Sequence, residues 1–331
     1  MKTAISWWVR AAACAAIFSL APWAATAQPE SAGYPSRPMR IVVPYPAGGG
    51  TDVLARMIGQ KFTETWGQSV IVENKPGANG WIGNGTVAKA APDGYTILLT
   101  ISTVVYAPYL YDKLPYDVNK DLVPVSMLTR TPNLLVVPAS VPATTLEEFV
   151  ALMRKQPHKH SYGSYGQGST AHVAGETLNR QAGLDMVHVA YKGAAPLVSD
   201  LLGGQVPAGF VDASTMRPHA RSDKVRILAV SGTQRVSYLP DVPTFAERGY
   251  KGMELVGYFL MMAPAGTPKD IVGKLAGAAA AVLRMPENRT RVEEMGMTVV
   301  GSTPEELGQA MQADGETFGR AVTQANIRIE K

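Results

Sequence analysis

The segment VVPYPAGGGTDVLAR, residues 42–56, places three consecutive glycines directly before an apolar stretch of helical period. The helix predicted there begins near Thr51 and Asp52. The first N–H groups of a helix have no partner inside it, and with the helix dipole they attract anions. Glycine also lets a ligand approach the backbone closely. Gly48, Gly49, Thr51 and Asp52 are therefore candidate anion-binding residues, although the same residues could serve only to turn the chain and cap the helix.

The same arrangement recurs later in the chain. GSYGQGSTAH (163–172) and YKGAAP (191–196) each lead from a short predicted strand through glycine into a predicted helix, and NKPGANGWIGN (74–84) has a similar pattern. Such loops gather at the carboxyl ends of parallel strands, where open α/β sheets bind ligands. We therefore predict one shared anion-binding pocket. Its candidate residues in these later loops are Gly168, Ser169, Thr170, Lys192 and Gly193.

Other ligand chemistries fit these loops less well. A phosphate-binding loop requires G-x-x-x-x-G-K-[ST], and no such lysine follows the glycines. Gly166-Gln167-Gly168, followed by Ala171, matches a dinucleotide fingerprint only weakly. No pair of histidines has convincing zinc spacing, so we predict neither a metal site nor a cofactor. His172 lies one turn into a predicted helix, where it either lines the pocket or accepts a hydrogen bond in the core.

An enzymatic alternative is a secreted α/β hydrolase that uses Ser169 as its nucleophile, with His172 and Asp212. The nucleophile elbow G-x-S-x-G is absent, because the run from Gly163 to Gly166 has the wrong spacing. Ser169 and His172 lie on one predicted helix, and nothing in the sequence indicates a base that activates the serine. We therefore predict no catalytic residue and a protein that is not an enzyme.

Short apolar strands alternate with helices along most of the chain. The runs YTILLT (95–100) and RILAV (226–230) are apolar on both faces, as buried parallel strands require. This alternation predicts an α/β fold with parallel sheets and helices on both faces. We place domain I at residues 37–138 plus 235–331 and domain II at residues 139–234.

The N-terminal residues 1–27 have the composition of a cleavable export signal. Lys2 and Arg10 are followed by an alanine-rich apolar run and by the small-x-small pattern Ala25-Thr26-Ala27. Residues 28–36 are polar and proline-rich, which indicates a tether. Cleavage removes the one cysteine, so the exported chain relies on its core without disulfides.

The charge balance excludes one class of partner. The formal net charge of +4 becomes +2 when Lys2 and Arg10 are removed. Lysines and arginines form no clustered block, which argues against a surface that binds nucleic acid. We therefore expect a soluble exported protein that binds a small anion.

Several motifs, taken in order, are similar to one known family. They are IVVPYPAGGGTDVLAR, VENKPGANGWIGNGTVAKAAPDGYTILL, GSYGQGSTAHVAGE, VHVAYKGAAPLVSDLLGGQVPAGF and LPDVPTFAERGY. The resemblance is to the Bug family, the periplasmic solute receptors of tripartite tricarboxylate transporters. It extends from about Pro38 almost to the C-terminus.

The resemblance implies a type II periplasmic-binding-protein fold, in which two α/β domains joined by a hinge close on a ligand in the interdomain cleft. It implies small organic carboxylates as ligands, aromatic and dicarboxylic acids among them, held largely by backbone N–H groups. It implies a monomer that delivers its ligand to transporter membrane subunits or, in some relatives, to a signalling partner such as a sensor kinase. It also adds Ser102, Thr103 and Asp212 to the site residues carried over from the loops.

Two aromatic residues could set the choice of ligand. Trp81 follows the Asn79-Gly80 turn, and Tyr106 lies just beyond Thr103. Rings that face the cleft would stack on a flat ligand, which predicts a preference for aromatic or extended carboxylates. The alternative for Trp81 is that its ring packs against the back of its own loop.

Overall fold

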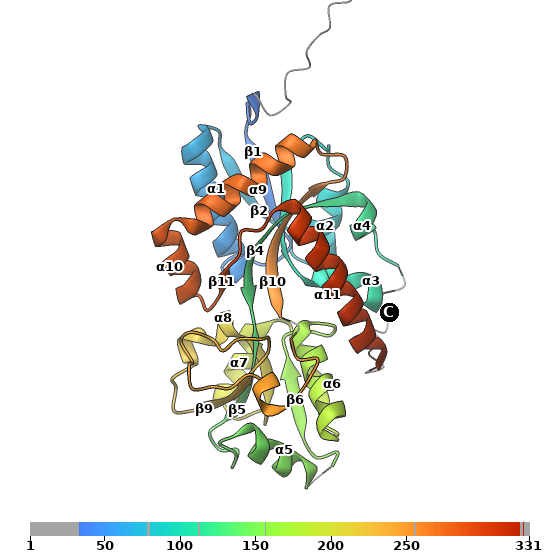
Figure 1. The fold of residues 1–331 in the computed structure, drawn as a ribbon, viewed down its shortest axis with the longest axis vertical. Helices are drawn as coiled ribbons and strands as arrows, with labels where there is room; N and C mark the ends of the chain where they lie inside the picture. Colours follow the sequence, from blue (N-terminus) through green and yellow to red (C-terminus); the bar gives the residue numbers. More distant parts are fainter. Residues whose placement is uncertain are drawn as a thin grey trace, which may run out of the picture.

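The computed structural model describes residues 33–77, 80–111, 113–155, 157–254, 256–324 and 327, which form two α/β lobes stacked along the long axis (Figure 1). The predicted signal peptide, residues 1–27, lies outside the described residues. The end of the predicted tether, residues 28–36, differs from expectation where it is described. The Tyr34 side chain is buried, and its hydroxyl donates a hydrogen bond of 2.6 Å to the Gly94 carbonyl. Residues 33–36 therefore begin the first lobe.

The first lobe contains a six-stranded sheet with the order β11-β4-β10-β3-β1-β2. β1 pairs in parallel with β2 and β3, whereas β10 is antiparallel to β3 and β4. The sheet is therefore mixed, and the expectation of a parallel sheet is wrong for β4, β10 and β11. The strands are β1 (Met39–Val43), β2 (Val70–Asn74), β3 (Thr96–Ile101), β4 (Leu122–Thr131), β10 (Gly257–Pro264) and β11 (Thr298–Val299).

Helices cover both faces of this sheet. In β3, Ile97 and Leu99 join the core beneath α1 and α9, whereas Leu98 joins the core beneath α2, α3 and α11. This alternation follows from the two-residue period of a strand. The helices of the lobe are α1 (Gly50–Trp66), α2 (Trp81–Ala88), α3 (Thr103–Leu110), α4 (Val118–Asp121), α9 (Lys269–Arg284), α10 (Pro286–Glu294) and α11 (Pro304–Gln324).

The second lobe contains a five-stranded sheet with the order β7-β6-β8-β5-β9, in which β5 is antiparallel to both neighbours. Its two cores lie beneath α5 and α6 on one face and beneath α7 and α8 on the other. The strands are β5 (Asn133–Pro138), β6 (Ser161–Ser164), β7 (Val187–Ala190), β8 (Gly209–Asp212) and β9 (Val225–Val230). The helices are α5 (Leu146–Arg154), α6 (Thr170–Ala182), α7 (Ala194–Leu202) and α8 (Ala213–Met216).

The crossings between lobes differ from the predicted boundaries of 37–138, 139–234 and 235–331. β5 pairs with β8 and β9, so the first crossing lies at Thr131–Asn133 and not after residue 138. After β9 the chain stays with the second lobe, because Thr244 bridges to Val230 and Phe245 enters that lobe's core. The return crossing therefore lies just before β10 and not at residue 235. A strand belongs to the lobe whose strands it pairs with by hydrogen bonds. The positions of prolines, from which the boundaries were predicted, do not reveal that pairing.

The two crossings lie side by side. Gly257, at the start of β10, pairs with Thr131, at the end of β4, so β4 runs toward the second lobe and β10 runs back from it into the first (Figure 1). On one side of the molecule α11 also reaches the second lobe, where Val173 of α6 is buried in the same cluster as Phe318 of α11. The lobes therefore meet through two adjacent strands and the contact between α11 and α6. Arg217, just after α8 in the second lobe, also donates a hydrogen bond of 3.3 Å to the Glu293 carbonyl of α10.

Candidate ligand-binding site

A cavity of about 620 Å³ lies between the lobes, at the carboxyl ends of strands from both sheets. The N-terminal ends of α1, α3, α6 and α7 open into it. Eight of the fifteen predicted site residues line the cavity, and they come from both lobes. These eight are Thr51, Ser102, Thr103, Ser169, Thr170, Lys192, Gly193 and Asp212.

The start of α1 supplies backbone donors to the cavity. Gly49 is the N-cap residue, with φ −75° and ψ 167°, and it offers no side-chain acceptor to the helix. Gly50 and Thr51, the first two helical residues, line the cavity. Their N–H groups have no partner within the helix, because such partners would have to precede its first residue. This end of α1 therefore presents to the cavity the unpaired amides that an anion site requires.

Gly48 and Asp52 were predicted as ligand contacts, but the structure places them outside the cavity lining, where they support the loop. The Gly48 N–H donates a hydrogen bond of 2.9 Å to the Asp52 carboxylate, which also accepts bonds from Arg56 and Asn74. Burial by itself would raise the pKa of Asp52, but these hydrogen bonds lower it overall. Gly49 also lies outside the lining, although it caps the helix that contributes Gly50 and Thr51.

Ser102 and Thr103 form the start of α3 and line the cavity beside α1. The Ser102 N–H is bonded to the Tyr258 carbonyl at 2.9 Å, which fixes the end of β3 against β10. The Thr103 hydroxyl lies 3.1 Å from the hydroxyl of Tyr45, another lining residue. No side chain caps α3, so its first amides remain available to a ligand.

In the second lobe, Ser169 and Thr170 bring the start of α6 to the cavity. The Ser169 hydroxyl accepts a hydrogen bond from the His172 N–H at 3.2 Å and donates to the Gly166 carbonyl at 2.7 Å. The Thr170 hydroxyl bonds to Tyr165 at 2.6 Å and to Asn133 at 3.1 Å. These contacts hold the loop rigidly against β5.

His172 and Gly168 do not line the cavity. Of the two roles considered for His172, the structure shows a hydrogen bond in the core. The Gly168 N–H donates to Nδ1 of His172 at 3.0 Å, so this glycine amide already has a partner. The His172 ring stacks on His188, with centroids 3.7 Å apart, and the His188 Nε2 lies 2.8 Å from the Ser164 hydroxyl. Because the His172 imidazole accepts from Gly168 and the Ser169 hydroxyl donates to a carbonyl, the hydrolase geometry is not formed.

We expect this histidine pair to make stability depend on pH. Burial lowers the pKa of His172 from 6.5 to about 3, with a contribution from His188, and burial lowers the pKa of His188 from 6.5 to about 4. The unfolded chain therefore binds more protons than the folded chain between about pH 6.5 and pH 4. Stability should fall as the pH drops through this window, by about 1.4 kcal/mol per pH unit for each proton.

Urea denaturation at a series of pH values measures this effect. The slope of the free energy of unfolding against pH should correspond to between one and two protons. It should not reach two, because His188 is only partly buried. His172→Gln keeps a hydrogen-bond acceptor but does not titrate, and it should flatten the profile. A profile that His172→Gln leaves unchanged would contradict the assignment.

The start of α7 completes the cavity wall in the second lobe. Gly193 caps this helix with a φ of 113°, a conformation that favours glycine, and no side chain satisfies the first helical amides. The Gly193 N–H itself is bonded to the Tyr165 carbonyl at 3.1 Å. Ala194, the first helical residue, and Lys192 both line the cavity. Lys192 thus supplies a positive charge beside the uncapped amides of α7.

Neither aromatic residue proposed to select the ligand lines the cavity. Trp81 packs edge-on against Tyr111, with centroids 3.8 Å apart, so its ring lies at the back of its loop. Tyr106 is fully buried and stacks on Phe318 at 4.1 Å. The Tyr106 side chain belongs to the buried cluster that α3 forms with α11, and not to the cavity lining. These two rings therefore give no support to a preference for aromatic carboxylates, which stays a prediction.

Other aromatic residues do line the cavity, and they were missed. They are Tyr45, Tyr165, Tyr191, Tyr258 and Phe259. Tyr45 and Tyr191 flank glycine loops in the sequence, which is the signal that could have identified them. Tyr258 and Phe259 come from the return crossing, a strand that was not predicted.

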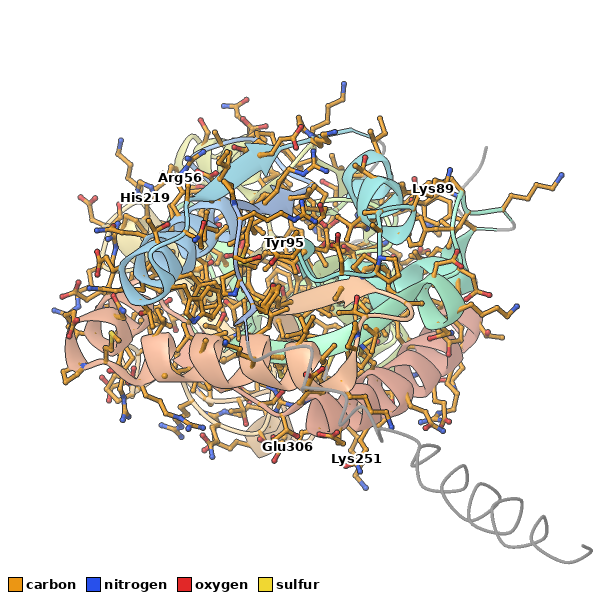
Figure 2. All side chains as sticks on the ribbon, turned by 90° about the horizontal axis from the view of Figure 1, so that it is seen from above. Arg56, Lys89, Tyr95, His219, Lys251 and Glu306 are labelled. Carbon is orange, nitrogen blue, oxygen red and sulfur yellow. The ribbon has the colours of Figure 1, made fainter. Side chains whose placement is uncertain are left out.

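Charged side chains are spread over the surface of the described residues. Charged side chains project on all sides in Figure 2, with Arg56, Lys89 and Glu306 on different parts of the outline. Within the described ranges, no group of three or more His, Cys, Asp or Glu side chains could hold a metal ion. Among the same residues, no helix is both long and apolar enough to cross a membrane.

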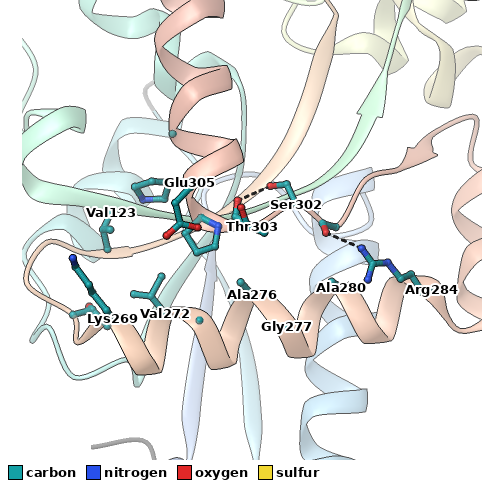
Figure 3. A pocket seen from close by; sticks show the side chains of 16 residues that line it. Val123, Lys269, Val272, Ala276, Gly277, Ala280, Arg284, Ser302, Thr303 and Glu305 are labelled. Carbon is teal, nitrogen blue, oxygen red and sulfur yellow. Dashed lines mark hydrogen bonds between the residues drawn. The ribbon is translucent and has the colours of Figure 1, made fainter. Parts of the chain in front are cut away.

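A second cavity, of about 650 Å³, lies within the first lobe between α9 and the start of α11 (Figure 3). Ala276, Gly277 and Ala280 of α9 form one wall, and the Arg284 side chain closes one end by donating to the Gly301 carbonyl. All of its lining residues belong to one lobe. Lobe closure would not enclose a ligand there, so the interlobe cavity is the candidate binding site.

Two α/β lobes joined by adjacent strands, with helix N-termini converging on the cavity between them, define the class of two-lobed solute receptors. A family model described as "Tripartite tricarboxylate transporter family receptor" matches residues 54–327. The chain belongs to this family, TctC, and the predicted resemblance to Bug receptors is confirmed.

Individual relatives agree with this assignment. The chain is 40% identical to Protein BugT of Bordetella pertussis over 253 residues, which cover 75% of this chain and 78% of BugT. An R. palustris protein solved with adipate has a TM-score of 0.83 and 32% identity, and the match covers 89% of this chain and all of that one. MatC of Rhodopseudomonas palustris, solved with bound malate, has a TM-score of 0.77 and 32% identity, with 87% and 100% covered.

Proposed function

We propose that this chain is a periplasmic receptor that captures a small organic carboxylate between its lobes and delivers it to the membrane subunits of a tripartite tricarboxylate transporter. The proposal rests on the family and on relatives whose structures hold adipate and malate. The export signal predicted at residues 1–27 supports the periplasmic location. No cofactor or metal is part of the proposed function.

The observation that carries the proposal is the convergence of helix N-termini from both lobes. α1 and α3 face the cavity from the first lobe, and α6 and α7 face it from the second. Each helix end carries roughly half a positive charge, and the first amides of α1, α3 and α7 lack side-chain caps. Together with Lys192, these groups favour an anion over a neutral guest.

Lobe closure strengthens this binding. The crossings at Thr131 and Gly257 are adjacent and lie in the cavity lining, so a small change there moves one lobe toward the other. Closure excludes water, and in a medium of lower polarity each amide dipole interacts more strongly with the carboxylate. The closed form, as a monomer, is the state that we propose the transporter, or a sensor kinase, recognises.

A comparison of acids with their amides tests the proposal. Isothermal titration calorimetry would use adipate, succinate, citrate, nicotinate and benzoate, each beside its primary amide. At least one acid should bind, and its amide should bind about a hundredfold more weakly, because the amide lacks the negative charge that the helix ends attract. Equal affinities for acid and amide would contradict the anion-binding function.

A further inference from the structure

The interlobe cavity contains one negatively charged side chain, although its other features favour an anion. Lys192 and Asp212 are the two charged residues among those that line it. Asp212 ends β8 and caps the short helix α8, where it accepts hydrogen bonds from the Thr215 N–H and from the Ser214 and Thr215 hydroxyls. Capping of α8 explains why a carboxylate is tolerated there, but it occupies only part of the hydrogen-bonding capacity of Asp212.

The two oxygens of Asp212 are used unequally. Oδ1 accepts from the Thr215 N–H at 2.8 Å and from the Ser214 hydroxyl. Among the described residues, Oδ2 accepts only from the Thr215 hydroxyl, at 2.9 Å, which it shares with Oδ1. An ionised carboxylate accepts about four hydrogen bonds, so acceptor capacity remains on Oδ2. The cap therefore leaves one oxygen able to bind a further donor.

No positive side chain in the described part of the chain forms an ion pair with Asp212. Its charge acts on the cavity wall: burial raises the pKa of the lining residue Tyr165, and the negative charge of Asp212 raises it further. A second carboxylate placed beside Asp212 would be repelled. A hydroxyl or ammonium group placed there would instead donate a charge-assisted hydrogen bond.

We infer that Asp212 selects a carboxylate ligand that carries a hydrogen-bond donor, a hydroxyl or an ammonium group, over the corresponding plain acid. This inference rests on the proposed function, because it concerns the same cavity. The ligand carboxylate occupies the helix ends, and its donor group binds Oδ2 of Asp212. Selection then has two parts, since the donor is attracted and an unsubstituted acid leaves the Asp212 charge without a partner.

Calorimetric titration of matched acids tests this inference. One series is succinate, L-malate and L-aspartate, and the other is glutarate, L-2-hydroxyglutarate and L-glutamate. The wild-type protein should bind a donor-bearing member at least about tenfold more tightly than the plain acid of its series. Comparison of the hydroxy acid with the amino acid of each series shows which donor group is preferred.

Asp212→Asn is the informative variant, because asparagine keeps an oxygen for capping α8 and loses the charge. It should reduce the preference to about threefold or less, with the plain acid gaining affinity. Asp241→Asn, at an exposed aspartate of the same lobe outside the cavity, is the matched control and should change neither affinity. A thermal melt of each variant checks that the lobe is folded.

The outcomes distinguish failure of the Asp212 inference from failure of the proposed receptor function. Equal binding of plain and donor-bearing acids by the wild type would overturn the role of Asp212 and leave the receptor function standing. A preference that persists unchanged in Asp212→Asn would overturn it as well. Binding of none of the compounds would overturn both this inference and the proposed function.

Discussion

Replacing Gly49 by aspartate is expected to leave the protein folded and to weaken carboxylate binding by at least about a hundredfold. Gly49 is the N-cap of α1 and has an extended conformation that any residue can adopt. The nearest atom to an added Cβ is the Pro46 carbonyl oxygen at 3.7 Å, which is ordinary contact. An aspartate there accepts hydrogen bonds from the first amides of the helix. Its carboxylate thus replaces the ligand's carboxylate and repels it.

Calorimetric titration with the best-binding acid, paired with a thermal melt, measures both effects. Gly49→Asn is the matched control, because it caps the helix without a charge, and it should weaken binding less than Gly49→Asp. Gly49→Ala adds no cap and should bind within about threefold of wild type. If Gly49→Asp binds the acid as tightly as the wild type, the ligand carboxylate does not bind at the N-terminal end of α1.

Replacing Phe318 by alanine is expected to lower the free energy of unfolding by about 3–5 kcal/mol. The Phe318 ring is fully buried and stacks on Tyr106 with an interplanar angle of 8°. The same cluster contains Tyr258, next to the return crossing, and Val173 of the second lobe. The cavity left by the missing ring therefore opens at the contact between α11 and α6, where the lobes meet.

Urea denaturation followed by circular dichroism measures this loss. Phe318→Leu keeps most of the buried volume and should cost less than half as much as Phe318→Ala. A loss below about 1 kcal/mol for Phe318→Ala would show that the cluster rearranges to fill the space, and that the α11–α6 contact contributes little to holding the lobes together.

The sequence predicted which loops reach the interlobe cavity better than it predicted the contacts within them. Glycine before a helix identifies where unpaired amides occur, and the starts of α1, α6 and α7 do reach one cavity. The sequence does not reveal which amides a side chain four residues later will occupy. Asp52 accepts from Gly48, and His172 accepts from Gly168, in the same local arrangement. These acceptors became apparent only from the three-dimensional contacts.

The topology was predictable only in part. Strands that alternate with helices, such as β1, β2 and β3, can be predicted from their local hydrophobic pattern and short connections. β10 does not, because it returns from the other lobe and inserts antiparallel between β3 and β4, far away in sequence. Its partners depend on the long-range path of the chain. The lining residues Tyr258 and Phe259 were missed for the same reason.

The central claim is that backbone amides of both lobes bind one carboxylate. Titration of the ¹⁵N-labelled protein with the best-binding acid, followed by amide ¹H–¹⁵N correlation spectra, tests it most directly. Saturation should shift the amide protons of Gly50 and Thr51 in the first lobe and of Ala194 in the second downfield together, at one shared affinity. Shifts confined to one lobe, or centred on the cavity between α9 and α11, would contradict the claim.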